Sequence, residues 1–184
     1  MNEDWRTITN PATGEEVTFV ETSQETGGLR VVMRLTLAPG GAVQAHSHRL
    51  AESFECVEGQ FDFRLDGKTR RLEPGESASV PPGRIHSFSN ETGAPVTVRI
   101  TATPAGDIER LLRTVSALAR AGRLTPGKPL KDPLLAARLV VPDHVYVPPL
   151  PRPVYWPLMY AMAALGGRRA DRAIDRYAES GNRE

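Results

Sequence analysis

Apolar and polar residues alternate with a period of two in several short runs of the first 104 residues. Residues 29–37 show the pattern well, because Val31, Met33, Leu35 and Leu37 alternate with a more polar set. A period of two directs alternate side chains to opposite faces of a strand, so each run predicts a strand with one buried face. Comparable runs occupy residues 15–22, 52–57, 61–65 and 96–102.

Turn-forming residues separate these runs. A turn at residues 10–14 precedes the first long run, and Gly27-Gly28 precedes the second. Asp66-Gly67 follows the run at 61–65 and predicts a tight hairpin, because both residues tolerate a positive φ. Many short strands separated by turns are typical of a closed or sandwiched all-β unit.

The pattern changes after Pro104. Residues 106–121 carry apolar residues at helical spacing, and Gly122 is placed to end the helix that they predict. We therefore divide the chain into a β domain, residues 1–104, and a helical and proline-rich extension, residues 105–184.

Prolines dominate the middle of the extension. Residues 126–157 hold nine of the sixteen prolines, which predicts an irregular arm with at most a short helix near 134–140. An apolar run at 154–165, interrupted by Pro157, predicts a buried helix. It is followed by a glycine pair and a charged helix with arginines at 168, 169, 172 and 176.

Charge differs between the two parts although the chain as a whole carries a net charge of +1. Residues 1–104 contain 10 basic and 14 acidic residues, and residues 105–184 contain 13 and 8. The near-neutral total gives no indication of a nucleic-acid partner. The N-terminus lacks an apolar signal segment and no run is long enough for a transmembrane helix, so we expect a cytoplasmic protein. A single cysteine, Cys56, agrees with a reducing compartment, and its spacing from Glu52 makes it a buried apolar residue rather than a ligand.

Candidate metal ligands gather in two segments. His46 and His48 lie two residues apart, so a strand directs both imidazoles to the same face. Glu52 opens the next strand, and a bend between the two strands returns its carboxylate toward the imidazoles. His86 begins another short strand after a Pro-Pro-Gly turn.

Both segments match the two-part signature of the cupin superfamily. The first part has the spacing Gly-x5-His-x-His-x3-Glu-x6-Gly and is met by Gly40, His46, His48, Glu52 and Gly59. The second has the spacing Gly-x5-Pro-x-Gly-x2-His-x3-Asn and is met by Gly75, Pro81, Gly83, His86 and Asn90. The chain thus resembles a small, single-domain, quercetinase-like metal-binding cupin over residues 15–103. The resemblance implies a mainly β fold, a double-stranded β-helix or jelly-roll-like barrel, with a metal held by His46, His48, Glu52 and His86.

Such a donor set has a defined chemistry. One divalent transition metal is expected, and imidazole and carboxylate donors suit iron, manganese, nickel, copper and zinc alike. Four protein ligands leave an octahedral ion two open positions for substrate, water or dioxygen. A dioxygenase or isomerase reaction on a small organic molecule is our first hypothesis, and a non-catalytic cupin that binds or senses a small ligand is the second.

The barrel interior decides which ligand fits. If alternate residues of each strand continue to point inward, as the ligands do, the cavity is lined by Gln44, Phe54, Phe61, Phe63 and Phe88. The alternative for each aromatic is that it fills the core. A mostly apolar cavity lined by these residues would suit an aromatic or other small organic molecule. We find no nucleophile-base pair and no phosphate-binding glycine loop in the sequence.

The apolar run of the extension requires a partner surface. We predict a homodimer in which the extension buries Trp156, Leu158, Met159 and Met162, because an excess of basic residues in the extension is attracted to an acidic barrel. The competing interpretation is a helix on a membrane surface, where the four arginines that follow would meet anionic lipid.

Overall fold

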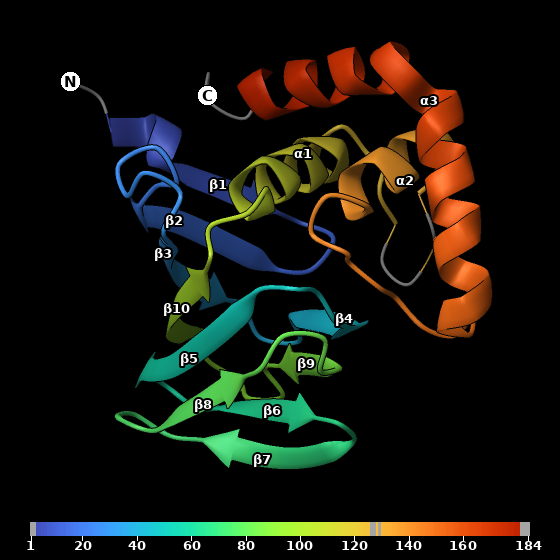
Figure 1. Ribbon diagram of the computed structural model, residues 1–184. Helices are drawn as coiled ribbons and strands as arrows, with labels where there is room; N and C mark the ends of the chain where they lie inside the picture. The colour runs from blue at the N-terminus through green and yellow to red at the C-terminus, as the bar shows by residue number, and fades with distance from the viewer. Residues whose placement is uncertain (1–2, 126–127, 129, 181–184) are drawn as a thin grey trace.

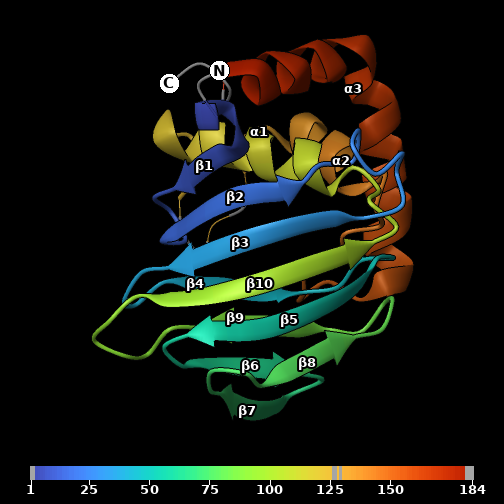
Figure 2. The same ribbon diagram turned by 90° about the vertical axis from the view of Figure 1, so that its left-hand side faces the viewer.

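A computed structural model of the protein describes residues 3–125, 128 and 130–180. Across these residues, ten strands form two antiparallel sheets that face each other (Figures 1 and 2). The larger sheet has the order β1-β2-β3-β10-β5-β8, and the smaller has the order β4-β9-β6-β7. The strands are β1 (Thr7–Asn10), β2 (Glu15–Glu21), β3 (Val31–Leu37), β4 (Ala42–His46), β5 (Ala51–Glu58), β6 (Phe61–Leu65), β7 (Lys68–Leu72), β8 (Ser77–Val80), β9 (His86–Ser89) and β10 (Val96–Thr103).

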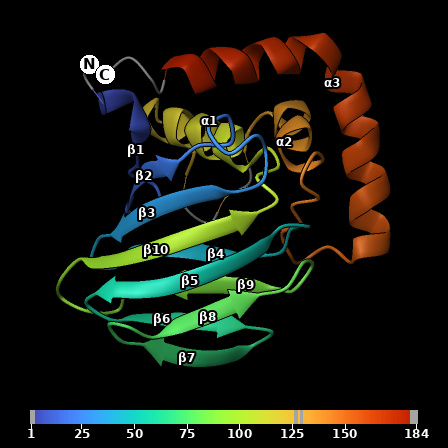
Figure 3. The ribbon, with the colours of Figure 1, turned by 60° about the vertical axis from the view of Figure 1, so that its left-hand side comes forward.

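The helices belong almost entirely to the extension. A 3-10 turn, η1 (Glu3–Arg6), precedes β1, and the extension supplies α1 (Ile108–Arg120), α2 (Pro133–Val140) and α3 (Arg152–Ser180). Helix α1 packs against β1, and the second half of α3 runs across α1 (Figure 3). The predicted mainly β fold with a helical, proline-rich extension is confirmed, while the division at residue 104 stays a prediction. Pro126 and Pro129 of the predicted arm lie outside the described residues.

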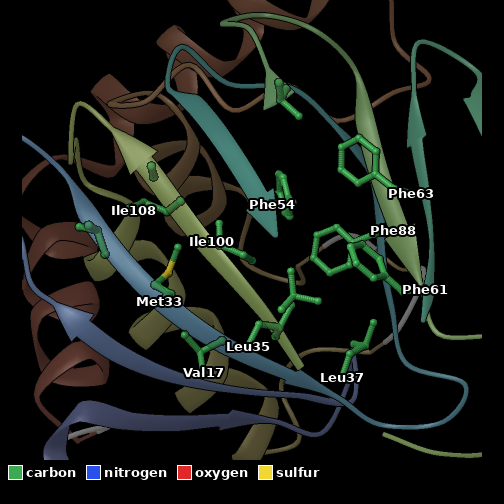
Figure 4. Close-up of a cluster of buried hydrophobic side chains, with 14 of the residues drawn as sticks. Val17, Met33, Leu35, Leu37, Phe54, Phe61, Phe63, Phe88, Ile100 and Ile108 are labelled. Atoms are coloured by element: carbon green, nitrogen blue, oxygen red, sulfur yellow. The ribbon is translucent and has the colours of Figure 1, made fainter. Parts of the chain in front are cut away.

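Aromatic side chains fill the space between the two sheets. Phe61 and Phe63 from β6 and Phe88 from β9 face Phe54 of β5, with ring centroids 5.1 to 6.4 Å apart (Figure 4). Alternate residues of β3 and β10 close the cluster from the larger sheet. Burial of each such ring contributes on the order of 2–3 kcal/mol, so this cluster is the main source of the barrel's stability.

The hairpin between β6 and β7 has the predicted turn. Asp66 and Gly67 both have positive φ, 47° and 81°, which is the geometry that matches the twist of a two-residue hairpin. Cys56 is also placed as expected, buried in the barrel core.

The apolar run of the extension forms a helix but is not buried in this chain. Gly167 interrupts α3 with a φ of 45°, so the helix bends and its first half runs beside the barrel (Figures 1 and 3). Leu158 is 44% exposed and Leu165 is 78% exposed, whereas Trp156, Met159 and Met162 are half-buried. The expectation of a buried helix is therefore wrong for the single chain, because only one face of the run meets the protein. The homodimer stays a prediction. None of the described helices combines the length and apolar character needed to cross a bilayer.

Candidate metal centre

Three imidazoles and one carboxylate meet at one end of the barrel. His46 ends β4, His86 begins β9, and the two residues pair across the smaller sheet. His48 lies in the bend after β4, and Glu52 enters from β5 in the opposite sheet. One ring nitrogen from each histidine lies within 4.8 Å of those of the other two. The structure thus brings together all four residues that the sequence singled out.

Backbone carbonyls orient the three rings. Nδ1 of His46 lies 2.8 Å from the Gln44 carbonyl oxygen, and Nδ1 of His48 lies 3.1 Å from that of Leu50. Nδ1 of His86 lies 3.2 Å from the carbonyl oxygen of Arg84. A carbonyl only accepts, so each Nδ1 carries the proton. In the neutral imidazoles, the lone pair is then on Nε2, the nitrogen available to a metal.

Glu52 is the acceptor between two of these rings. Its Oε2 lies 3.0 Å from His48 Nε2 and 3.1 Å from His86 Nε2. The first contact has hydrogen-bond geometry, but His86 Nε2 is buried without a hydrogen-bond partner among the described residues. A buried nitrogen without a partner is costly unless something else binds it. The orphaned atom points into the cluster, where a metal ion would satisfy it.

The charges of the cluster are balanced locally. Burial alone would raise the pKa of Glu52, but the hydrogen bond from His48 and the nearby ring of His86 outweigh it and hold that pKa well below its usual range. Burial opposes the charged form of His48, yet the hydrogen bond to Glu52 prevails and raises its pKa. Burial, followed by the nearby charge of His86, lowers the pKa of His46 to about 4. An ionised Glu52 and a neutral His46 are the forms that a divalent cation binds.

The proline-rich arm holds the segment that carries the histidines. Ser47, between His46 and His48, forms a two-way backbone bridge with Tyr146, with N···O distances of 2.9 and 2.7 Å. Two residues further on, the Arg49 N–H donates to the Asp143 carbonyl at 2.9 Å. The extension therefore supplies backbone partners for the free edge beside β4, which restricts the positions of both imidazoles.

A cavity of about 100 Å³ opens beside the imidazoles. Its walls are mainly apolar and come from both sheets, with Phe54, Phe88, Met33 and Ile100 among them. The extension closes the remaining side with Ile108, Leu111 and Leu112 of α1 and with Val145 of the arm. The site is thus a small apolar chamber with the four polar side chains at one end.

The comparison with known families agrees with this geometry. Residues 33–102 match the family model described as a cupin domain, a range that contains all four clustered side chains. Residues 33–102 form a domain of the cupin superfamily. A curated relative, quercetin 2,3-dioxygenase of Bacillus subtilis (strain 168), is 31% identical over 78 residues, which cover 41% of this chain. The matched residues cover only 23% of the length of that relative.

Solved cupin structures also match. An RmlC-like cupin from Shewanella frigidimarina NCIMB 400 is 22% identical, covering 53% of this chain and 83% of its own, with a TM-score of 0.47. KdgF from Halomonas sp. is 20% identical, covering 55% of this chain and 90% of its own, with a TM-score of 0.49.

The predicted cavity residues of the cupin barrel divide into two groups. Phe54 and Phe88 line the cavity, while Phe61 and Phe63 lie in the packed core beyond it, the alternative considered for each aromatic. Gln44 is exposed and outside the lining, contrary to the expectation. The register between β4 and β9 shifts between Val43 and His46, so a bulge breaks the parity and Val43 faces the cavity instead.

One carboxylate in the cavity wall was missed from the sequence. Glu15 of β2 lines the cavity, accepts a hydrogen bond from the Thr13 hydroxyl, and has a pKa raised by burial. It shares the parity of the buried residues Val17 and Phe19. That alternation was the available signal, because a glutamate two residues before an inward valine faces inward as well.

Proposed function

We propose that this cupin is a metal-dependent protein that acts on a small organic molecule, with a dioxygenase or isomerase type of reaction. The metal ligands in this proposal are His46, His48, Glu52 and His86. One observation carries it: three clustered imidazoles have Nδ1 committed to backbone carbonyls, a buried carboxylate lies beside two of them, and the Nε2 of His86 is buried without a hydrogen-bond partner among the described residues.

The protein side chains have separate tasks in this proposal. A bound divalent metal would supply Lewis-acid or redox chemistry at the open end of the cluster. His48 Nε2 must give up the proton that it shares with Glu52 before it can act as a ligand, so loading releases a proton. Glu52 keeps its negative charge and partly neutralises the ion. The backbone carbonyls prevent the rings from rotating away.

The cavity limits the substrate. Its volume of about 100 Å³ is below the ~300–1,000 Å³ of sites for drug-sized ligands, so the substrate class is small. Phe54 and Phe88 offer apolar faces that exclude water from the reacting centre. The similarity to a quercetin 2,3-dioxygenase supports an oxygen-dependent reaction on a small enol or catechol-like compound, and an isomerisation remains the other form of the proposal.

Oxygen uptake and metal spectroscopy test the proposal together. Iron- or cobalt-substituted protein is mixed with small catechols and enols, and both the metal spectrum and oxygen consumption are followed. We expect the spectrum to change on addition of at least one compound and the change to disappear in His86→Ala. If a fully loaded protein showed an unchanged spectrum with every compound, an open reactive site would be ruled out. Spectral change without oxygen uptake or isomerised product would favour the non-catalytic alternative.

The alternative function is that of a small-ligand sensor. One observation favours it: α1 and the arm supply Ile108, Leu111, Leu112 and Val145 to the same cavity as the imidazoles. A ligand there touches the extension directly, so occupancy could be transmitted to it. Hydrogen exchange distinguishes the two functions, since a sensor predicts altered protection of α1 amides on ligand binding in the absence of turnover.

A further inference from the structure

A second and larger cavity lies within the extension. Its volume is about 590 Å³, and it is bordered by α2, by the second half of α3 and by the segment after α1. We propose that this cavity, called here the arginine cavity and defined by Arg123, Leu134, Arg169, Ala170, Ala173 and Arg176, binds a small amphipathic organic anion: an apolar body with a carboxylate or phosphate group.

One face of α3 builds the wall of the arginine cavity. Arg169, Ala170, Ala173 and Arg176 follow one another at intervals of one, three and three residues, so they share a face of the helix. Seven residues separate the two arginines, which places them about 10 Å apart along the helix axis. The alanines between them leave free space where larger side chains would fill the cavity.

Arg123 supplies a third cation from the opposite side. Its Nη1 donates to the Tyr177 hydroxyl at 2.6 Å, and Tyr177 also borders the cavity. The tyrosine follows Arg176 directly in the helix. Arg123 therefore lies near the Tyr177 end of the arginine cavity, while Arg169 lies about two turns of α3 away.

Among the described residues, these cations have no carboxylate partner, unlike Arg110 and Arg138 of the extension. Arg138 is paired with Asp171 across α2 and α3, and Arg110 is paired with Asp175 across α1 and α3. Within the described part of the chain, no ion pair joins Arg123, Arg169 or Arg176 to an acidic side chain.

The acidic residue of the lining does not neutralise them. Asp132 caps α2, and its Oδ1 accepts from the backbone N–H groups of Leu134 and Leu135. Three arginines against one aspartate leave a surplus of two positive charges on the lining. Guanidinium groups with free donors in a concave site favour an oxyanion.

The floor of the arginine cavity is apolar. Leu134 and Leu135 of α2 form it together with the alanines of α3. The two helices approach closely at Gly166, where an added Cβ would lie 3.2 Å from the Leu134 carbonyl oxygen. Leucines beneath arginines suit a ligand that has an apolar body in addition to its charge.

Calorimetric titration of the full-length protein tests the site. The probes are 2-naphthoate and 1-naphthyl phosphate, with uncharged 2-naphthol and inorganic phosphate as ligand controls. We expect one saturable site per chain for the naphthyl anions and much weaker binding of both controls. Arg169→Ala and Arg176→Ala should each weaken binding tenfold or more, because each removes a charged hydrogen-bond donor. Arg169→Lys should recover part of the loss.

Arg172→Ala is the matched control variant. Arg172 is exposed on the same half of α3 but is not part of the cavity lining, so its removal should leave probe affinity unchanged. Equal losses in Arg172→Ala and Arg169→Ala would indicate general charge attraction and overturn the proposal. Binding abolished by EDTA would assign the probe to the metal centre, and binding to anionic lipid vesicles but to neither naphthyl anion would assign the arginines to a membrane surface. Either result would also overturn it.

Discussion

The barrel and the extension place their charged groups in different surroundings. In the barrel, Glu52, His48 and His86 are buried beside aromatic walls, and Glu52 Oε2 lies 3.0 Å from His48 Nε2 and 3.1 Å from His86 Nε2. In the extension, Arg110 and Arg138 pair across helices with partly exposed aspartates, and the exposed Arg169 and Arg176 border a wide cavity. A buried polar cluster depends on exact geometry, whereas exposed charges act through the local sum of their fields. The barrel is therefore suited to selective chemistry and the extension to recognition of charge.

The two parts are also joined at a small number of specific contacts. Asp143 of the arm accepts the Asp107 N–H at 2.7 Å, and its carbonyl accepts the Arg49 N–H. These contacts lie next to the bend that carries His48. Damage to the junction should consequently disturb the metal centre, although the extension supplies none of its proposed ligands.

The largest expected effect separates the packed core from the exposed face of α3. Phe61→Ala should lower the free energy of unfolding by about 3–5 kcal/mol, because it leaves a cavity beside the rings of Phe63 and Phe88. Leu158→Ala, at a position that is 44% exposed, should cost less than about 0.5 kcal/mol in a monomer. Chemical denaturation measures both. A large cost for Leu158→Ala that depended on protein concentration would reveal a partner on this face and support the predicted homodimer.

The junction gives the next largest effect. Gly106 has a φ of 52°, and an added Cβ would meet the Asp143 side chain and lie 2.9 Å from Leu50 Cδ2. Gly106→Ala should therefore destabilise the protein by about 2–3 kcal/mol and reduce its metal content. Gly122→Ala is the matched control, since its φ is 66° but its surroundings are open. Similar losses in the two variants, measured by thermal unfolding, would mean that backbone strain alone is responsible and that the contact with Asp143 is unimportant.

The pH dependence of stability should depend on His46 of the barrel. The pKa of His46 is lowered to about 4, first by burial and then by His86. Between pH 6.5 and 4 the unfolded chain therefore binds a proton that the folded chain does not, so stability falls as pH falls. Chelator-treated protein should lose about 2 kcal/mol from this source over that window. The lowered pKa of Glu52 acts in the same direction below about pH 4.5, where its contribution is lost.

Urea titrations at several pH values measure this effect. His46→Gln should flatten the decline between pH 6.5 and 4. The raised pKa of His48 has the opposite sign, because its contribution is present below about pH 6.5 and is lost as pH rises. A decline that persists unchanged in His46→Gln would contradict the assignment of the slope to the barrel.

The sequence predicted the features that depend on local spacing. The two-part signature predicted the four clustered side chains, and alternation predicted the strands, because both follow from the two-residue repeat of a strand. The hairpin turn at Asp66 and Gly67 was also predicted from the sequence. Helix α1 followed from apolar spacing and from Gly122 near its end, and α2 lies where a short helix was expected, near residues 134–140.

Features that depend on non-local contacts were not accessible in this way. The bulge between Val43 and His46 arises from pairing with β9, and it exposes Gln44. The bridge between Ser47 and Tyr146 joins segments almost one hundred residues apart in sequence. The exposure of the apolar run of α3 depends on which surface meets each face, and apolar content alone does not specify that surface.

Metal content measured directly is the most decisive test of the account. Protein purified without chelators is analysed by mass spectrometry for metals, in wild type and in the double variant His48→Ala, His86→Ala, with circular dichroism to verify the fold. The account predicts about one divalent transition metal per wild-type chain, and little in a double variant that keeps its β-sheet spectrum. Equal metal content in the two folded proteins would contradict the proposed centre.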